Sequence, residues 1–492
     1  MNEVAALILL LLGPFLGGVG ALLLPGRLRK DFSIFVTVVL LLGVGALSFS
    51  LEETLRYQIS GWSAPLGINL HVDGLSAVML LLTGIVASAV SMFAYGFYEE
   101  QKGKEYSEGF WPLFFMLWGS LNAVFLVSDL FTMYVCLELI TFASVALITI
   151  ANDREALRAA LKYLMTALTG SVAYLLGVAL IYGKTGVLDW TLVASRLNEG
   201  PVEWLALSLV TIGLLMKAAL FPLHFWLPGA HSIAPAPVSA LLSALVVKAP
   251  FFMMLRIWVQ VFPIPELAAN IIGALGAGAI IWGSFQAIIQ ERVKLMVAYS
   301  TVAQLGYLFL LFPLLSAASS SSDPKGINIL WEGAIYFTLS HGVAKSAIFL
   351  VSGIVLRATK TDYLKDMQGA ASRVPAAILV FGLAGISLIG LPPSGGFIAK
   401  WQLLTSAIRF GQWPYAVVIL FGGLLASGYV FRVLWHSFLT PEEAQTDKVR
   451  VPLIMLIAAG LLGIAIVVMG VRTEEISSVL KIGSPFFSGG TP

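Results

Sequence analysis

Apolar runs of about 20 residues recur along the chain, separated by short charged or Pro/Gly-rich breaks. Such a run crosses a hydrocarbon core of about 30 Å as a helix, in which every backbone polar group finds an internal partner. Of the 492 residues, 58% are hydrophobic and only 11% are charged, a composition that excludes a soluble protein. The sequence therefore predicts an all-α, polytopic membrane protein.

The apolar runs predict about fourteen transmembrane spans, with no connection long enough for a soluble domain. The spans are expected at 4–24, 32–50, 73–96, 110–128, 130–151, 158–182, 203–224, 236–258, 267–289, 294–316, 330–356, 375–408, 414–439 and 451–472. Basic residues follow the first run instead of preceding it, so we interpret that run as a retained helix and not as a signal peptide.

The charges between the spans predict how the chain lies in the membrane. Lys and Arg residues are concentrated in the connections after the odd-numbered spans, where Lys294 is counted, whereas Arg256 is counted on the opposite side. By the positive-inside rule the richer side is cytoplasmic, which places both termini outside the cell inner (plasma) membrane. The net charge of +2 does not suggest a nucleic-acid partner, and a single cysteine, Cys136, excludes a disulfide framework or a Cys-ligated iron–sulfur cluster.

Four ionisable residues interrupt otherwise apolar spans: Glu138, Lys217, Lys248 and Lys400. A charge at membrane depth costs at least about 2.5–3.5 kcal/mol and marks an ion or proton path by default. Glu138 is the only acid deep within a span, and a pair that it forms with a buried lysine can change between ionised and neutral forms under modest bias. The alternative is a static ion pair that holds two helices together.

Two of these lysines adjoin helix breaks. Lys217 is followed by Pro222 and Pro228, and Lys400 follows a PPSGG segment. A proline removes a helical hydrogen bond and frees a carbonyl, which a membrane tolerates only against protein or a wet cavity. Two broken helices that run in opposite directions indicate inverted repeats with sites near the midplane, whereas the alternative is a pair of proline kinks with snorkelling lysines.

Three histidines and one more lysine extend this set. His341 and Lys345 are four residues apart and share one helix face, as a proton relay requires, although either alone is more often a packing residue. His224 and His231 flank the first break, where they either link Lys217 to cytoplasmic water or cap the freed backbone. The sequence has no cluster of carboxylates, thiols or paired histidines, so we expect neither a metal nor a cofactor.

These segments resemble the antiporter-like subunit family shared by respiratory complex I, Mrp-type sodium/proton antiporters and membrane-bound hydrogenases. The resemblance is strongest in KAALFPLHFWLPGAHSIAPAPVSALLSALVVKAP, HGVAKSAIFL and GLPPSGGFIAKW. It implies fourteen helices, with spans 4–8 and 9–13 as two inverted five-helix repeats in which helices 7 and 12 are broken. It also implies functional roles for Glu138, Lys217, Lys248 and Lys400. The chain would then divide into helices 1–3 (1–109), the first repeat (110–260), the second repeat (261–440) and helix 14 with the tail (441–492).

Details of the resemblance separate the subfamilies. Lysine at position 400, where the M-type subunit of complex I has glutamate, argues against that subunit, and GWSAPLGINLHVDGLSA looks like the D subunit of Mrp antiporters and its hydrogenase counterpart. Gly229 stands where an acidic residue is common in the family, which leaves the cytoplasmic opening less acidic.

The resemblance implies a proton-translocating subunit of a multisubunit cation/proton antiporter of Mrp D type, whose partners are other membrane subunits. The alternative is a proton-pumping membrane subunit of a complex I-like NADH:quinone oxidoreductase or a membrane-bound hydrogenase. A self-contained solute transporter is the other rival, and it requires a roomy central cavity. We expect no self-contained active site, and sodium to move elsewhere in the complex, because one deep carboxylate is a poor start for a Na⁺ site.

Overall fold

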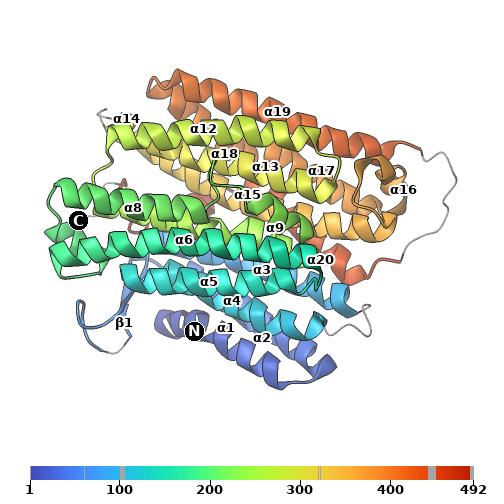
Figure 1. Ribbon diagram of the computed structural model, residues 1–492, viewed down its shortest axis with the longest axis horizontal. Helices are drawn as coiled ribbons and strands as arrows, with labels where there is room; N and C mark the ends of the chain where they lie inside the picture. The colour runs from blue at the N-terminus through green and yellow to red at the C-terminus, as the bar shows by residue number, and fades with distance from the viewer. Residues whose placement is uncertain are drawn as a thin grey trace.

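The computed structural model describes residues 2–59, 61–99, 106–319, 321, 323–440 and 450–487, and it is almost entirely helical (Figure 1). The first half contains α1 (Glu3–Leu23), α2 (Gly26–Ser50), α3 (Gly74–Glu99), α4 (Tyr106–Leu126), α5 (Leu130–Thr149), α6 (Arg154–Thr185), α7 (Trp190–Arg196), α8 (Pro201–Lys217), α9 (Leu227–Ile233), α10 (Ala236–Leu241) and α11 (Lys248–Arg256). The second half contains α12 (Glu266–Ile289), α13 (Val293–Phe309), α14 (Leu311–Ser319), α15 (Pro324–Thr359), α16 (Ala370–Arg373), α17 (Pro375–Ile389), α18 (Gly395–Arg409), α19 (Trp413–Phe438), α20 (Leu453–Val471) and α21 (Glu474–Leu480).

Twelve helices within the described residues are long and apolar enough to cross a membrane. The prediction of an all-α polytopic membrane protein is therefore confirmed. The expected spans 203–224 and 375–408 are not continuous helices. Helix α8 ends at Lys217 and α9 begins at Leu227, while α17 ends at Ile389 and α18 begins at Gly395. The chain is thus interrupted at both places where the prolines predict a break.

Short polar connections set the helix ends. The carboxylate of Asp129 accepts a hydrogen bond from the Thr132 amide at 2.6 Å and begins α5. Asp153 begins α6 in the same way through the Ala156 amide at 2.6 Å, and Gly186 ends that helix with a φ of 69°. These caps satisfy backbone groups that a helix end leaves free, so the few polar residues outside the spans determine the span boundaries.

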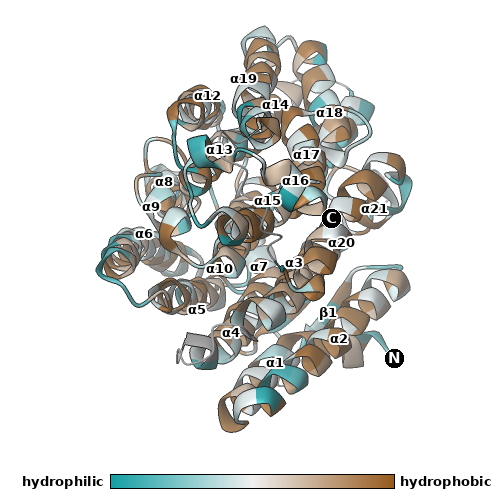
Figure 2. Ribbon diagram, turned by 90° about the vertical axis from the view of Figure 1, so that its right-hand side faces the viewer, coloured by the Kyte–Doolittle hydropathy of each residue, from teal (hydrophilic) through white to brown (hydrophobic). Residues whose placement is uncertain are grey.

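Small residues bring neighbouring helices close together. A Cβ atom added to Gly170 of α6 would lie 2.8 Å from the Gly213 carbonyl oxygen of α8, and one added to Gly276 of α12 would lie 2.8 Å from the Gly306 carbonyl oxygen of α13. Close approach of this kind is the main source of packing energy between helices in lipid. Figure 2 shows α15 in the middle of the bundle, with α1 and α2 at one edge and α19 at the other.

A β-hairpin, which hydropathy does not predict, connects α2 to α3. Strands β1 (Leu55–Gln58) and β2 (Asn69–Val72) are antiparallel, and Leu55 pairs with Val72. The Asn69 carbonyl accepts a hydrogen bond from the Ser128 amide at 3.1 Å, which attaches the hairpin to the connection before α5. Strand β2 leads directly into Asp73 and α3, so the hairpin sits at one end of the bundle.

Candidate functional site

Glu138 of α5 and Lys217 at the end of α8 form an ion pair inside the bundle. Lys217 Nζ lies 3.0 Å from Glu138 Oε1 and donates a second hydrogen bond to Thr141 Oγ1 at 3.1 Å. The Ser171 hydroxyl of α6 donates to the same carboxylate oxygen. The side chain of Lys217 is only 5% exposed and that of Glu138 only 12% exposed. The structure therefore brings the only predicted deep acid to the lysine at the first break.

The break holds Lys217 at the last turn of α8. Beyond it, Ala219 has a φ of 55°, and the next helix begins only at Leu227. The indole of Trp226 donates from Nε1 to the Met216 carbonyl at 3.0 Å and stacks on Tyr163 of α6 with ring centroids 4.2 Å apart. A cation at a helix C-terminus also interacts favourably with the free carbonyls there. The break therefore stabilises a buried ammonium group.

Lys248 is completely buried at a change of helix type. A π-helix, η1 (Leu242–Val246), separates α10 from α11, and the Lys248 ammonium donates to the Ser243 carbonyl. The Ser243 hydroxyl in turn lies 2.9 Å from Thr301 Oγ1 of α13. A π-turn frees carbonyls from the regular ladder and is frequent at functional sites. The expected span 236–258 is therefore continuous but locally unwound where its lysine lies.

His341 and Lys345 lie on α15 in the middle of the bundle. Lys345 Nζ donates to the Val297 carbonyl at 3.0 Å and to the Ser300 hydroxyl, both on α13. His341 is 2% exposed, and neither ring nitrogen has a hydrogen-bond partner within the described residues. The ring stacks on that of Phe337, with ring centroids 5.9 Å apart.

Lys400 occupies the second break. Its ammonium donates to the Leu388 carbonyl at 2.7 Å and lies 4.2 Å from the centroid of the Tyr307 ring. Gly390, which ends α17 with a φ of 92°, leaves room for the lysine, because a Cβ there would lie 2.7 Å from Lys400 Cδ. In the described part of the chain, no carboxylate forms an ion pair with Lys248, Lys345 or Lys400.

The contacts of His224 and His231 do not match the interpretation in which these histidines cap the backbone at the first break. His224 stacks on Phe221 with ring centroids 5.5 Å apart, and its Nδ1 is buried without a partner among the described residues. His231 of α9 is fully buried, and both its ring nitrogens lack a hydrogen-bond partner within the same residues. The side chain that donates to the Met216 carbonyl at the end of α8 is that of Trp226. A relay role for His224 and His231 stays a prediction.

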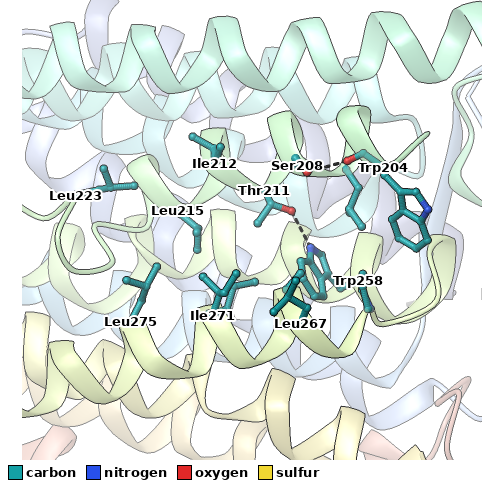
Figure 3. A pocket seen from close by; sticks show the side chains of 14 residues that line it. Trp204, Ser208, Thr211, Ile212, Leu215, Leu223, Trp258, Leu267, Ile271 and Leu275 are labelled. Carbon is teal, nitrogen blue, oxygen red and sulfur yellow. Dashed lines mark hydrogen bonds between the residues drawn. The ribbon is translucent and has the colours of Figure 1, made fainter. Parts of the chain in front are cut away.

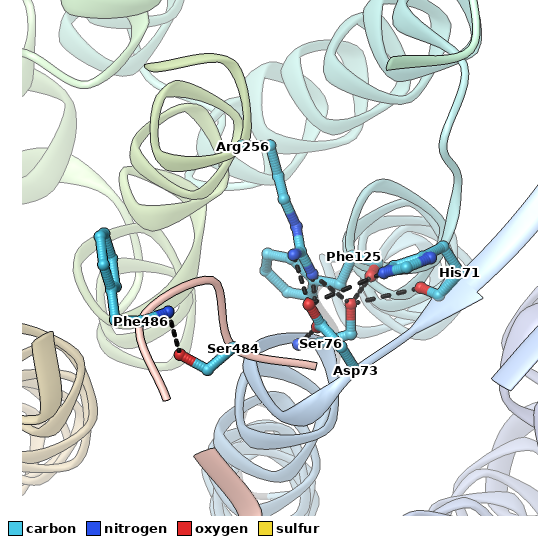
Figure 4. A network of polar contacts seen from close by, with 7 residues as sticks. All are labelled: His71, Asp73, Ser76, Phe125, Arg256, Ser484 and Phe486. Atoms are coloured by element: carbon cyan, nitrogen blue, oxygen red, sulfur yellow. Dashed lines mark hydrogen bonds and ion pairs between the residues drawn. The ribbon is translucent and has the colours of Figure 1, made fainter. Parts of the chain in front are cut away.

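Arg256, which the charge count assigns to a connection between spans, is instead 1% exposed at the end of α11. Figure 4 shows its side chain directed towards Asp73. Its guanidinium makes two hydrogen bonds of 2.5 Å with Asp73, and one of 2.9 Å with the Ser76 hydroxyl. The assignment was wrong because hydropathy places Arg256 at a span end and says nothing of a partner 183 residues away. The only sequence signal for this ion pair was the presence of Asp73 at the start of one span and Arg256 at the end of another.

The surroundings of this second ion pair compensate its burial. The guanidinium carbon lies 5.0 Å from the Trp190 ring centroid and 4.9 Å from that of Phe252, while His71 Nε2 lies 3.7 Å from Asp73 Oδ2. Burial by itself raises the pKa of Asp73, but the Arg256 charge and its hydrogen bonds outweigh this and hold that pKa below its ordinary range. The carboxylate of Asp73 therefore stays ionised beside Arg256.

Lys294 is also buried, although the sequence counts it among the cytoplasmic connections. Its ammonium donates to the carbonyl of Ala234, the residue that follows α9, and its amide donates to Asp362 Oδ1 at 3.1 Å. Lys294 is the second residue of α13, so its long side chain can reach back into the bundle. The lysine thus holds the end of the short helix that carries His231.

The arrangement can move protons and offers little for other chemistry. The bundle contains one buried ion pair and buried lysines that donate to carbonyls and hydroxyls. It also contains the imidazoles of His231 and His341, whose ring nitrogens have no hydrogen-bond partner within the described residues. Within the described residues, no three His, Cys, Asp or Glu side chains are placed to hold a metal ion. Buried ionisable groups inside a membrane bundle are typical of proton relays.

Comparisons with known proteins agree with this architecture. The family described as "NADH:quinone oxidoreductase/Mrp antiporter, TM" matches residues 127–426. The N subunit of NADH-quinone oxidoreductase from Desulforudis audaxviator is 33% identical, over 97% of this chain and 98% of its own length. The D subunit of the Na⁺/H⁺ antiporter from Alkalihalophilus pseudofirmus is 30% identical, over 82% of this chain and 81% of its own. The chain belongs to the NADH:quinone oxidoreductase/Mrp antiporter transmembrane family.

A solved structure shows the same fold. A chain of the Mrp complex from Dietzia sp. superposes with a TM-score of 0.87 at 22% identity, covering 99% of this chain and 98% of that one. At that level of identity the similarity concerns the fold alone. It extends over the complete bundle, including the regions outside residues 127–426.

Proposed function

We propose that this chain is the proton-translocating subunit of a multisubunit cation/proton antiporter of Mrp D type, assembled with other membrane subunits. The observation that carries the proposal is the Lys217–Glu138 ion pair at the end of the broken helix α8. The name of the 30% identical relative, the D subunit of a Na⁺/H⁺ antiporter, supports the same function. The completely buried Lys248 and Lys345 supply the next positions of a path.

The proposed path runs from Glu138 and Lys217 through Lys248 to Lys400. While the ion pair is closed, the carboxylate stabilises the proton on Lys217. When Glu138 is neutralised or withdraws, the charge on Lys217 loses its partner, and its proton moves towards Lys248. His341 and Lys345, four residues apart on α15, link Lys248 to Lys400. Lys400 then releases the proton through the second half of the bundle.

The same proposal includes the finer architecture. The two interrupted spans, α8–α9 and α17–α18, added to the twelve helices of the described residues that are long enough to cross a membrane, give fourteen transmembrane segments. Spans 4–8 and 9–13 form inverted repeats, and both termini lie outside the plasma membrane. The interruption at the corresponding helix of each repeat supports this division.

A proton-pumping subunit of a complex I-like redox enzyme is the second candidate. It is favoured by the 33% identity with the N subunit of an NADH-quinone oxidoreductase over 97% of this chain. The conduction path is the same in both cases, but electron transfer in other subunits would drive it in the redox enzyme.

Purification of the native complex and its reconstitution into vesicles tests the proposal and separates the two candidates. An antiporter of D type acidifies or alkalinises the lumen when a sodium gradient is imposed. A redox pump responds instead to a reductant and a quinone, and mass spectrometry of its subunits finds iron–sulfur proteins. A complex that moves no protons under either condition, although its subunits are intact, would refute the proton-translocating function.

A further inference from the structure

A cavity of about 490 Å³ lies between α8, α12 and a second π-helix, η2 (Ile257–Val261), close to the first break. Figure 3 shows that side chains of α8 face those of α12 across it, with Trp258 between them. The residues that define its length and walls are Trp204, Thr211, Leu215, Trp258, Ile271 and Leu275. Three of the lining residues are 49%, 75% and 52% exposed, namely Ile212, Leu267 and Ile271, so the cavity is a groove open to the membrane.

Two hydrogen bonds between lining residues reduce the polar surface that the groove offers to an occupant. The Ser208 hydroxyl donates to the Trp204 carbonyl at 2.8 Å, and Trp258 Nε1 donates to Thr211 Oγ1 at 2.9 Å (Figure 3). These bonds occupy the Ser208 hydroxyl and the Trp258 indole. The other lining side chains are aliphatic or aromatic apart from Pro265. Apolar cavities do not hold ordered water, so the chemistry selects a hydrocarbon.

The dimensions select a single alkyl chain. From Trp204 to Leu215 the helix α8 rises about 17 Å, close to the roughly 15 Å of one hydrocarbon leaflet. Spread over that length, 490 Å³ gives a mean cross-section of about 30 Å². A transmembrane helix about 10 Å across occupies about 80 Å², so the groove is too narrow to enclose a whole helix of another subunit.

The two ends of the groove differ in the way that a lipid requires. Trp204 lies near the start of α8, beside the ion pair of Lys184 and Glu203, whose nitrogen and oxygen are 3.6 Å apart. Tryptophan is enriched at this level of a membrane, where headgroups meet hydrocarbon. At the inner end, Leu223 belongs to the segment between α8 and α9 that follows Lys217. In the same segment Phe221 packs against Trp282 of α12, with ring centroids 6.2 Å apart.

We propose that this groove binds one acyl chain of a membrane phospholipid, drawn from the leaflet beside the α7–α8 connection. The methyl end of the chain rests on the segment 218–226, and the headgroup lies at the level of Trp204. The inference goes beyond proton transport and does not depend on it, because occupancy is measured without an activity assay.

Photo-crosslinking tests the proposal. The full chain, or its native complex, is reconstituted in phosphatidylcholine nanodiscs that contain a phosphatidylcholine with a diazirine in one acyl chain. After irradiation, mass spectrometry maps the adducts. We expect a clear excess on residues 204–215 and 267–275 over other membrane-facing residues. Ala268→Trp and Ile212→Trp, which fill the groove from α12 and α8, should reduce those adducts to the level of the surrounding lipid-facing surface.

Ala173→Trp is the matched control, because Ala173 is likewise a partly buried alanine, on α6, and does not line the groove. It should leave the excess unchanged, and all variants are compared after they elute as single species with wild-type melting temperatures. Uniform labelling of the membrane surface would overturn the proposal. Labelling in the groove that both filling variants leave unchanged would overturn it too. Protection of the groove in the complex but not in the isolated chain would assign it to another subunit instead.

Discussion

Lys217 Nζ lies 3.0 Å from Glu138 Oε1, at the residue where α8 stops inside the bundle. An ion pair made at a helix end differs from one made between two regular helices, because the segment beyond Lys217 can move without unfolding either α5 or α8. The Ser171 and Thr141 hydroxyls on each side of the pair offer alternative partners once it opens. This geometry suits a switchable pair better than a static one.

Gly390→Ala should impair the site around Lys400 without abolishing assembly. A left-handed backbone costs an alanine roughly 1–2 kcal/mol, and the added Cβ would lie 2.7 Å from Lys400 Cδ and push the ammonium away from the Leu388 carbonyl. We expect proton transport by the reconstituted complex to fall severalfold. Gly382→Ala on the same helix is the control, since a Cβ there meets nothing within 4 Å. Equal transport by both variants would contradict the positional role of Gly390.

Arg256→Met should destabilise the protein in a pH-dependent manner. In the wild type the pKa of Asp73 is held low, so the pair contributes its full stability above about pH 4 and loses it only as the pH falls further. Without Arg256, burial instead raises the pKa of Asp73, and a buried carboxylate without its partner costs roughly 3–5 kcal/mol at pH 7. Acidification from pH 7 to pH 5 should then recover part of the lost stability, because protonation removes the charge.

The melting temperature of the purified protein in detergent, followed by tryptophan fluorescence at both pH values, measures this effect. His71 is the other titratable group that faces Asp73, and it is present in every variant. The double variant Asp73→Asn with Arg256→Met should be more stable at pH 7 than Arg256→Met alone and should show no such recovery. If the melting temperature of the single variant does not rise between pH 7 and pH 5, the assignment is wrong.

The isolated chain should not exchange sodium for protons. A proton path conducts only downhill unless a second ion or a redox step biases it, and a ligand shifts an equilibrium only by its differential affinity for the two states. In proteoliposomes the chain alone should therefore build no pH gradient in response to a sodium gradient. A reproducible gradient, with co-purified subunits excluded by mass spectrometry, would make the chain a self-contained antiporter.

The sequence predicts the charged part of the candidate site well and the backbone that shapes it poorly. The pairing of Glu138 with Lys217 could be predicted because a membrane allows so few charges that a lone deep acid must find a buried base. The helix breaks could be predicted from proline chemistry. The π-turn before Lys248 could not, because its residues have no distinctive composition and only tertiary packing selects that winding.

The second buried ion pair shows the limit of hydropathy more clearly. Asp73 and Arg256 each stand at the end of an apolar run, where a charge normally faces water, and only the fold brings them together. The hairpin before α3 could not be predicted for a related reason. Its two strands of four residues each are too short to give a recognisable hydropathy pattern beside spans of about twenty residues. The sequence therefore indicates a distant contact where a lone buried acid needs a base, but not where both charges stand at span ends.

Proton transport by the reconstituted complex carrying Glu138→Gln tests the role of the buried ion pair most directly. Glutamine keeps the shape and the hydrogen bond from Ser171, but it cannot hold a charge or exchange a proton. Glu266→Gln, at the exposed start of α12, is the matched control and should transport as the wild type does. A fluorescent pH probe inside the vesicles measures the transport. We expect Glu138→Gln to reduce it to the level of empty vesicles while the complex stays assembled. Wild-type transport by that variant would contradict the role of the ion pair.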